Sequence, residues 1–124
     1  FSAPISARWA LAQAVTAAQA LPAQHKVAEI RTHVRAILSD NAFAIVPSAA
    51  GLAPLLNESG EAIDQLRMRT MHLTCAVGIS GVCQISIPLK NSAGVPVGVS
   101  LIGPAGSDLA LIRLATALSS TLPA

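Results

Sequence analysis

The chain has 124 residues, enough for one domain, of which 52% are hydrophobic and only 11% are charged, whereas an ordinary soluble domain carries about 25% charged residues. This is too little charge to cover a small globule, so we expect other polypeptide to cover much of its surface, either a missing remainder of the same protein or a tightly bound partner. The net charge of +2 is spread thinly and aromatic residues make up 2%, which excludes the basic stripe and the stacking platform of a nucleic-acid-binding domain.

The apolar runs are too short to cross a bilayer, because Ser80, Gln84 and Ser86 interrupt them well before the ~18 residues that a membrane helix needs. The chain starts with neither an initiator Met nor the basic segment of a signal peptide, which predicts a processed, truncated or excised chain. Cys75 and Cys83 make no disulfide framework, and their spacing matches no usual zinc site. We therefore predict no membrane association, a cytoplasmic location and two small buried cysteines.

The first half of the chain is predicted to form two helices and a strand. Residues 6–21 are rich in Ala, Leu and Gln, which favours a helix that ends where Pro22 follows. Over residues 23–39 the apolar positions recur at spacings of three and four, which indicates an amphipathic helix. The short apolar run 42–46, stopped by Pro47, is typical of a strand buried on both faces.

The second half is predicted to form a helix, a strand pair and a last helix. Acidic residues open the first of these helices, Gly78 suits its C-terminal cap, and its apolar stripe consists of Ile63, Leu66, Leu73 and Val77. Strands are expected over residues 83–89 and 97–102, and the short connection between them predicts antiparallel pairing. Ser107 is expected to cap the last helix, with an inward face of Leu109, Ile112, Ala115 and Leu118.

This order of elements predicts an α/β fold in which a partial mixed sheet is flanked by helices. The three strands cannot bury the apolar faces of all the helices in a closed core. We therefore expect the sheet to continue into strands that this chain does not contain, and we treat residues 1–124 as one incomplete domain.

The residues by themselves identify no catalytic or metal site. A metal site is suggested by three side chains spaced four apart on one helix face, His25, Glu29 and His33. They lie on the polar side of an amphipathic helix, and no further ligand is identifiable, so we interpret them as solvated. His72 is interpreted as a packed or rim histidine. Ser80, in "GISG", lacks the spacing of a nucleophile elbow, and no phosphate-binding or dinucleotide-binding motif is present. We predict no metal and no cofactor.

Several segments resemble the C-terminal end of the amidase signature family of hydrolases. The stretch "LTCAVGISGVCQISIPL" resembles the helix, A-G-x-x-G-x-P-Q segment and S-x-P-L strand of that family, and "GVPVGVSLIGPAGSDLALIRLATAL" resembles its G-x-P-V-G strand, L-I-G-P turn and last helix. Upstream, "AIVPSAAGLAPLL" is similar to the family's strand followed by P-T-x-P-G-x-A-P. Cys83 stands where most members have proline, and Ser48 and Ala50 replace threonine and proline. The resemblance implies the C-terminal portion of the amidase signature fold.

The resemblance also implies that the catalytic residues lie outside this chain. The family uses a Ser nucleophile activated through a second serine, held by a cis peptide bond, and a lysine, while a Gly/Ser-rich loop forms the oxyanion hole. No such Gly/Ser-rich run occurs in this sequence, so no catalytic residue is carried over. We therefore expect a partner polypeptide, or a missing segment, that carries the catalytic Ser, Ser and Lys.

The part of the chain that resembles a wall of the family's acyl pocket runs from Met71 to Ile85. Within it, we predict that Met71, Thr74 and Gln84 lie near a small-molecule amide substrate, although ordinary packing explains each of them at least as well. The apolar Met71 stands where amide-transferring relatives use an acid for a charged substrate, and this favours an uncharged acyl or aryl group.

Two functions from different classes follow. In the first, the chain is the C-terminal segment of an amidase that hydrolyses linear amides, and it is inactive when isolated from its catalytic segment. In the second, it is a noncatalytic, amidase-like binding or structural component of an obligate complex. Both predict an exposed apolar interface, so the sequence does not separate them. An inactive truncation is a third alternative, which predicts aggregation of the isolated chain.

Overall fold

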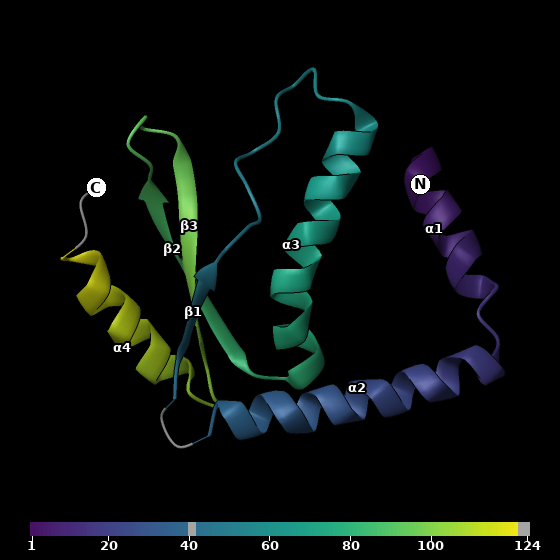
Figure 1. Ribbon diagram of the computed structural model, residues 1–124, viewed down its shortest axis with the longest axis horizontal. Coiled ribbons are helices and arrows are strands. Elements are labelled where there is room, and N and C mark those ends of the chain that lie inside the picture. The colour runs from purple at the N-terminus through teal and green to yellow at the C-terminus, as the bar shows by residue number, and fades with distance from the viewer. Residues whose placement is uncertain (40–41, 122–124) are drawn as a thin grey trace.

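The computed structural model of the chain describes residues 1–39 and 42–121. Within them the order of elements agrees with the predicted order (Figure 1). The elements are α1 (Ala3–Gln13), α2 (Ala17–Ile37), β1 (Ala44–Pro47), α3 (Gly60–Ser80), β2 (Cys83–Lys90), β3 (Pro96–Gly103) and α4 (Asp108–Ser119). Among these described residues, no helix is long and apolar enough to span a membrane.

The first two helices are divided at a different place from the one predicted. The sequence predicts a break at Pro22, but Pro22 lies inside α2, and the break falls just before Ala17. Thr16 begins α2 with a capping box: its backbone N–H donates to Gln19 Oε1 at 2.9 Å, and its hydroxyl oxygen accepts from the backbone N–H of Gln19 at 3.4 Å. This reciprocal cap satisfies two donors at the helix start. It sets the boundary of α2 even though Pro22, in the second turn, has no N–H and so costs the helix one backbone hydrogen bond.

The end of α3 also corrects a prediction. Gly78 is predicted to cap this helix, but it lies within α3, and the cap is Gly81, whose φ of 60° is left-handed. The backbone N–H of Gly81 donates to Val77 O at 2.9 Å. A left-handed residue at this position closes the helix and favours glycine, whereas a glycine in a helix interior is merely less favourable than alanine.

The sheet has the strand order β1-β3-β2, and both neighbouring pairs are antiparallel. The predicted strand pair is therefore confirmed, and so is the α/β class with a small sheet and flanking helices. Parallel pairing, which a mixed sheet requires, does not occur among the described strands and stays a prediction for a continued sheet. The prediction that the first strand is buried on both faces is wrong here, because Ile45 is 68% exposed at an outer strand that α4 does not cover.

The two faces of the sheet carry separate apolar clusters. On one face, Ile87 and Leu101 pack against Leu111 and Ala115 of α4. On the other face, Ile102 packs with Leu38, after α2, and with Val77 near the C-terminal end of α3. From this contact α3 leans away from the sheet toward its own N-terminus, while α2 crosses beneath its C-terminal end (Figure 1).

The inward face of α4 differs from the predicted face. Ala115 is buried and Leu118 is half-buried, as predicted, but Leu109 is 71% exposed and Ile112 is also exposed, while Leu111 is fully buried. Apolar residues occur on several faces of this helix, so the sequence does not fix its rotation. Ser107 precedes the helix as predicted, yet its hydroxyl donates to Pro104 O at 2.7 Å instead of capping α4.

Candidate functional site

Two of the predicted substrate-contacting residues lie one turn apart on α3. Met71 is 38% exposed, and its Sδ accepts a contact of 3.4 Å from Arg67 Nη1. Thr74 is half-buried, and its hydroxyl donates to Thr70 O at 3.1 Å. Because this bond uses the hydroxyl proton of Thr74, only the oxygen lone pairs remain for another partner.

The third predicted residue, Gln84, lies on β2. It is half-buried and stands opposite Ile102 in the β2–β3 register, which places it on the face of the sheet that α2 and α3 cover. In the described part of the chain, no hydrogen bond joins Gln84 to Met71 or Thr74. The structure thus brings the three residues to the α3 side of the sheet, and their contact with substrate stays a prediction.

The same face of the sheet holds a cluster of three serine hydroxyls that the sequence analysis did not predict. We call Ser48, Ser86 and Ser100 the serine ring, because each hydroxyl oxygen lies within hydrogen-bonding distance of the other two. The oxygen–oxygen distances are 2.8 Å for Ser48 and Ser100, 2.9 Å for Ser86 and Ser100, and 3.2 Å for Ser48 and Ser86. Ser100 is fully buried, Ser48 is half-buried and Ser86 is exposed.

Strand register assembles this ring from three distant segments. Ser86 and Ser100 are direct cross-strand partners, and Ser48 follows β1, where its backbone N–H donates to Gly98 O at 2.9 Å. Gly98 must lack a side chain, because a Cβ there would lie 2.8 Å from Ser48 Oγ. The only signal in the sequence is a polar serine within each of two apolar strands, "QISIPL" and "VGVSLIG", and it does not reveal the pairing.

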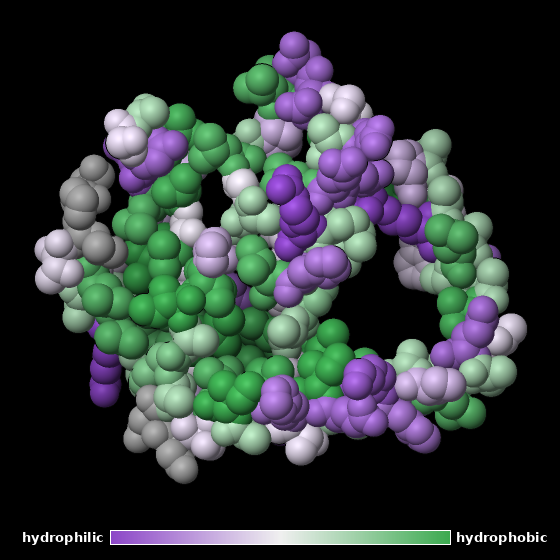
Figure 2. All heavy atoms as spheres, in the orientation of Figure 1, coloured by the Kyte–Doolittle hydropathy of each residue, from purple (hydrophilic) through white to green (hydrophobic). Residues whose placement is uncertain are grey.

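A hollow of about 610 Å³ lies between the start of β3, the segment after β1 and α3. Figure 2 shows the molecule open between the β2–β3 hairpin and the segment after β1. The lining is mostly apolar and consists of Pro47, Ala49, Ala50, Gly51, Leu52, Ala53, Pro54, Leu66, Thr70, Pro96, Val97 and Gly98. The backbone N–H of Ala50 donates to Thr70 Oγ1 at 3.2 Å, which ties the segment to α3. Gly98 lines the hollow and also touches Ser48, so the serine ring lies at its edge.

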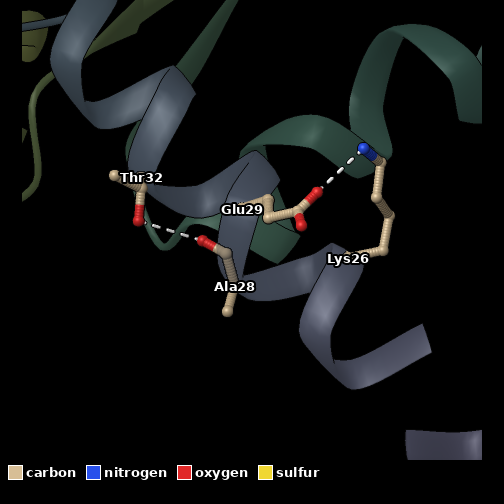
Figure 3. Close-up of polar contacts among 4 residues, drawn as sticks. All are labelled: Lys26, Ala28, Glu29 and Thr32. Carbon is tan, nitrogen blue, oxygen red and sulfur yellow. Dashed lines mark hydrogen bonds and ion pairs between the residues drawn. The ribbon is translucent and has the colours of Figure 1, made fainter. Parts of the chain in front are cut away.

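Most charged side chains of the described residues lie on helices, and none of them hydrogen-bonds to the serine ring. Lys26 and Glu29 of α2 form an exposed ion pair of 2.9 Å (Figure 3), so the Glu29 carboxylate, one of three side chains weighed as metal ligands, contacts an ammonium group. Over the ranges that the structure describes, no three His, Cys, Asp or Glu side chains gather to hold a metal ion. No histidine or lysine among these described residues hydrogen-bonds to the serine ring, so none of them is placed to activate a ring hydroxyl as a nucleophile.

Comparison with known proteins assigns the chain to a family. The sequence profile of the Amidase family matches residues 2–112. The chain belongs to this family. Its relatives include Amidase 1 of Oryza sativa subsp. japonica, which is 34% identical over 95 residues, covering 77% of this chain and 22% of that protein. This amidase-family chain therefore spans about a fifth of the length of a curated relative that it matches.

Solved structures support the same assignment. An allophanate hydrolase of Kluyveromyces lactis is 30% identical with a TM-score of 0.70, over 82% of this chain and 16% of that one. A glutamyl-tRNA(Gln) amidotransferase component from Thermotoga maritima has a TM-score of 0.79 over 96% of this chain and 26% of that one; at 23% identity it shows the fold alone. The resemblance to a C-terminal part of an amidase signature protein is thus confirmed.

Proposed function

We propose that this chain is the C-terminal segment of an amidase that hydrolyses linear carboxylic amides to an acid and ammonia or an amine. The family match over residues 2–112 is the observation that carries this proposal. The chain supplies sheet and a wall of the acyl pocket, and a segment or chain beyond it supplies a catalytic Ser, a cis-Ser and a Lys. Cytoplasmic location is proposed from Cys75 and Cys83, which are unpaired.

The division of labour follows from the chemistry of amide hydrolysis. A nucleophile must attack the carbonyl carbon, donors must stabilise the oxyanion, and the leaving nitrogen must receive a proton as the C–N bond breaks. Water then completes the reaction by supplying the hydroxyl of the acid. The serine ring has no described base beside it, so it is unsuited to the attack, and the chain's polar groups are better suited to binding.

The proposed substrate contacts are Met71, Thr74 and Gln84. Met71 provides apolar surface, Thr74 provides acceptor lone pairs, and the Gln84 amide provides both a donor and an acceptor. The guanidinium group beside Met71 belongs to Arg67, and it also contacts Asp64 Oδ1 at 3.1 Å. Because this pair is close to neutral overall, an uncharged acyl or aryl group remains the proposed substrate class.

The test uses the complete protein that carries this chain, purified with whatever polypeptide accompanies it. We expect ammonia release from simple amides such as propionamide and benzamide by that material, and none by residues 1–124 alone. Met71→Asp is expected to raise the KM for benzamide. Gln65→Asp, at an exposed position roughly 120° around α3 from Met71, adds the same charge and serves as the control. Amide hydrolysis by the isolated chain would refute the division of labour.

The same preparation separates the rival function. A companion chain bearing a Gly/Ser-rich loop and a lysine, together with ammonia release, supports the amidase. An unrelated companion without any amide hydrolysis supports a noncatalytic, amidase-like component of an obligate complex.

A further inference from the structure

The serine ring places an exposed oxygen without a spare proton, that of Ser86, on the α3 side of the sheet. We propose that Ser86 Oγ accepts a hydrogen bond from the N–H of a primary carboxamide and thereby distinguishes an amide ligand from the corresponding carboxylate. This inference rests on the proposed function for the identity of the ligand as an amide substrate. Its physical basis is a count of the protons and lone pairs of the ring.

Each serine hydroxyl has one proton to donate and two lone pairs that accept. With distances of 2.8, 2.9 and 3.2 Å around the triangle, each hydroxyl can donate to one neighbour and accept from the other. A closed ring, in which Ser48 donates to Ser86, Ser86 to Ser100 and Ser100 to Ser48, therefore uses all three protons. Each oxygen keeps one free lone pair and no free proton, so the ring can only accept from a ligand.

Burial decides which of these lone pairs a ligand can reach. Ser100 is fully buried and Ser48 is half-buried, whereas Ser86 is exposed. The hydroxyl of Ser86 also lies within 2.9 Å of the buried Ser100 hydroxyl, and chains of hydrogen bonds in a low-dielectric setting strengthen one another. Ser86 is thus the accessible acceptor of the ring.

The surroundings of Ser86 suit a small amide. Gln84, two residues earlier on the same face of β2, offers an amide donor and acceptor, and the apolar hollow begins at Gly98, which touches Ser48 of the ring. A carboxamide NH₂ donates to Ser86, but a carboxylate has only acceptor oxygens and meets a lone pair there. Hydrolysis replaces the NH₂ group with a carboxylate oxygen, so the acid product loses this hydrogen bond and is released more readily.

The test measures the affinity of propionamide and propionate for the complete protein that carries this chain, by ligand-observed NMR titration. We expect Ser86→Ala to weaken propionamide binding roughly threefold to tenfold, the loss of one hydrogen bond. Propionate binding is expected not to weaken, because the carboxylate loses only a facing lone pair. Ser86→Thr keeps the hydroxyl and is expected to restore the amide affinity. Ser92→Ala, in the exposed β2–β3 turn, is the matched control and is expected to change neither affinity.

A second variant tests the proton count itself. Ser100→Ala leaves two hydroxyls that share one hydrogen bond, so one proton becomes free to meet a carboxylate. We expect the ratio of propionamide to propionate affinity to fall, a change that a purely structural ring would not produce. The proposal would be overturned if Ser86→Ala lowered the affinity for both ligands equally, or if Ser100→Ala left the ratio of the two affinities unchanged. It would also be overturned if neither ligand bound. Binding is read at times short compared with turnover, and ammonia release is a separate readout. Ammonia release with an unchanged affinity ratio would therefore refute this inference and leave the proposed amidase intact.

Discussion

The contact between α2 and the end of α3 gives a quantitative test of the fold around the candidate site. Arg35 Nε donates to Ser80 O at 2.8 Å, and its Nη2 lies 3.4 Å from Gly81 O. These carbonyls lie at the C-terminal end of α3, on its last residue and its cap, where a cation is favoured by the helix dipole. We expect Arg35→Met, which keeps much of the side-chain length and removes the donors, to loosen the junction between α3 and β2.

The magnitude follows from the geometry of this contact. A hydrogen bond from a charged donor contributes roughly 1.5–3 kcal/mol. Arg35 is exposed to water, which screens the charge and favours the lower end, about 1.5 kcal/mol. The longer Nη2 contact adds little to this value. A loss of about 1.4 kcal/mol corresponds to a tenfold change in an equilibrium constant, so local opening of the junction is expected to become about tenfold more frequent.

Hydrogen–deuterium exchange with mass spectrometry measures this opening directly. The backbone N–H groups of Gly81 and Val82 both point to Val77 O, at 2.9 and 3.4 Å, and peptides that contain them are expected to exchange about tenfold faster in Arg35→Met. Arg113→Met, on the exposed side of α4, is the control and is expected to leave these peptides unchanged. Unchanged exchange in Arg35→Met would refute the assignment of the guanidinium as a cap of α3.

Two pairs of substitutions test the corrected helix boundaries and faces. Gly81→Ala is expected to destabilise the protein by about 1 kcal/mol, because φ at Gly81 is left-handed. Gly78→Ala lies inside α3 with open space around it, so it is expected to stabilise the protein by roughly 0.5–1 kcal/mol. Urea denaturation measures both changes in the free energy of unfolding, and shifts of the same sign would contradict the assignment of Gly81 as the cap. Leu111→Ala, 1% exposed in the core, is expected to cost about 2–5 kcal/mol, and Leu109→Ala, on the exposed side of the same helix, less than about 0.5 kcal/mol. Equal losses in thermal unfolding would show that the rotation of α4 is wrong.

Local patterns predicted the elements more reliably than their limits. The strand pair was predictable because two apolar runs flank a short polar connection, in which Asn91 Oδ1 accepts from the N–H groups of Ala93 and Val95. The start of α2 was missed because Pro22 is a more conspicuous signal than the Thr16–Gln19 cap, although the cap decides the boundary. The cap of α3 was misplaced because two glycines lie close together and only the backbone conformation distinguishes them.

The candidate site was predictable only in part. Met71, Thr74 and Gln84 came from a resemblance to the amidase family, and the structure brings them to the same side of the sheet without testing their contact with substrate. The serine ring was not predicted, because its members come from three segments and meet only through strand register and the missing side chain of Gly98.

The sequence by itself determined the family, the order of helices and strands and the antiparallel strand pair, because these depend on motifs, apolar periodicity and turn residues that are close together in the chain. Tertiary structure alone decided which face of α4 is buried, which strand lies at the sheet edge, and that Ser48, Ser86 and Ser100 form one ring. These features depend on contacts between segments far apart in sequence, where several apolar faces compete and packing selects one.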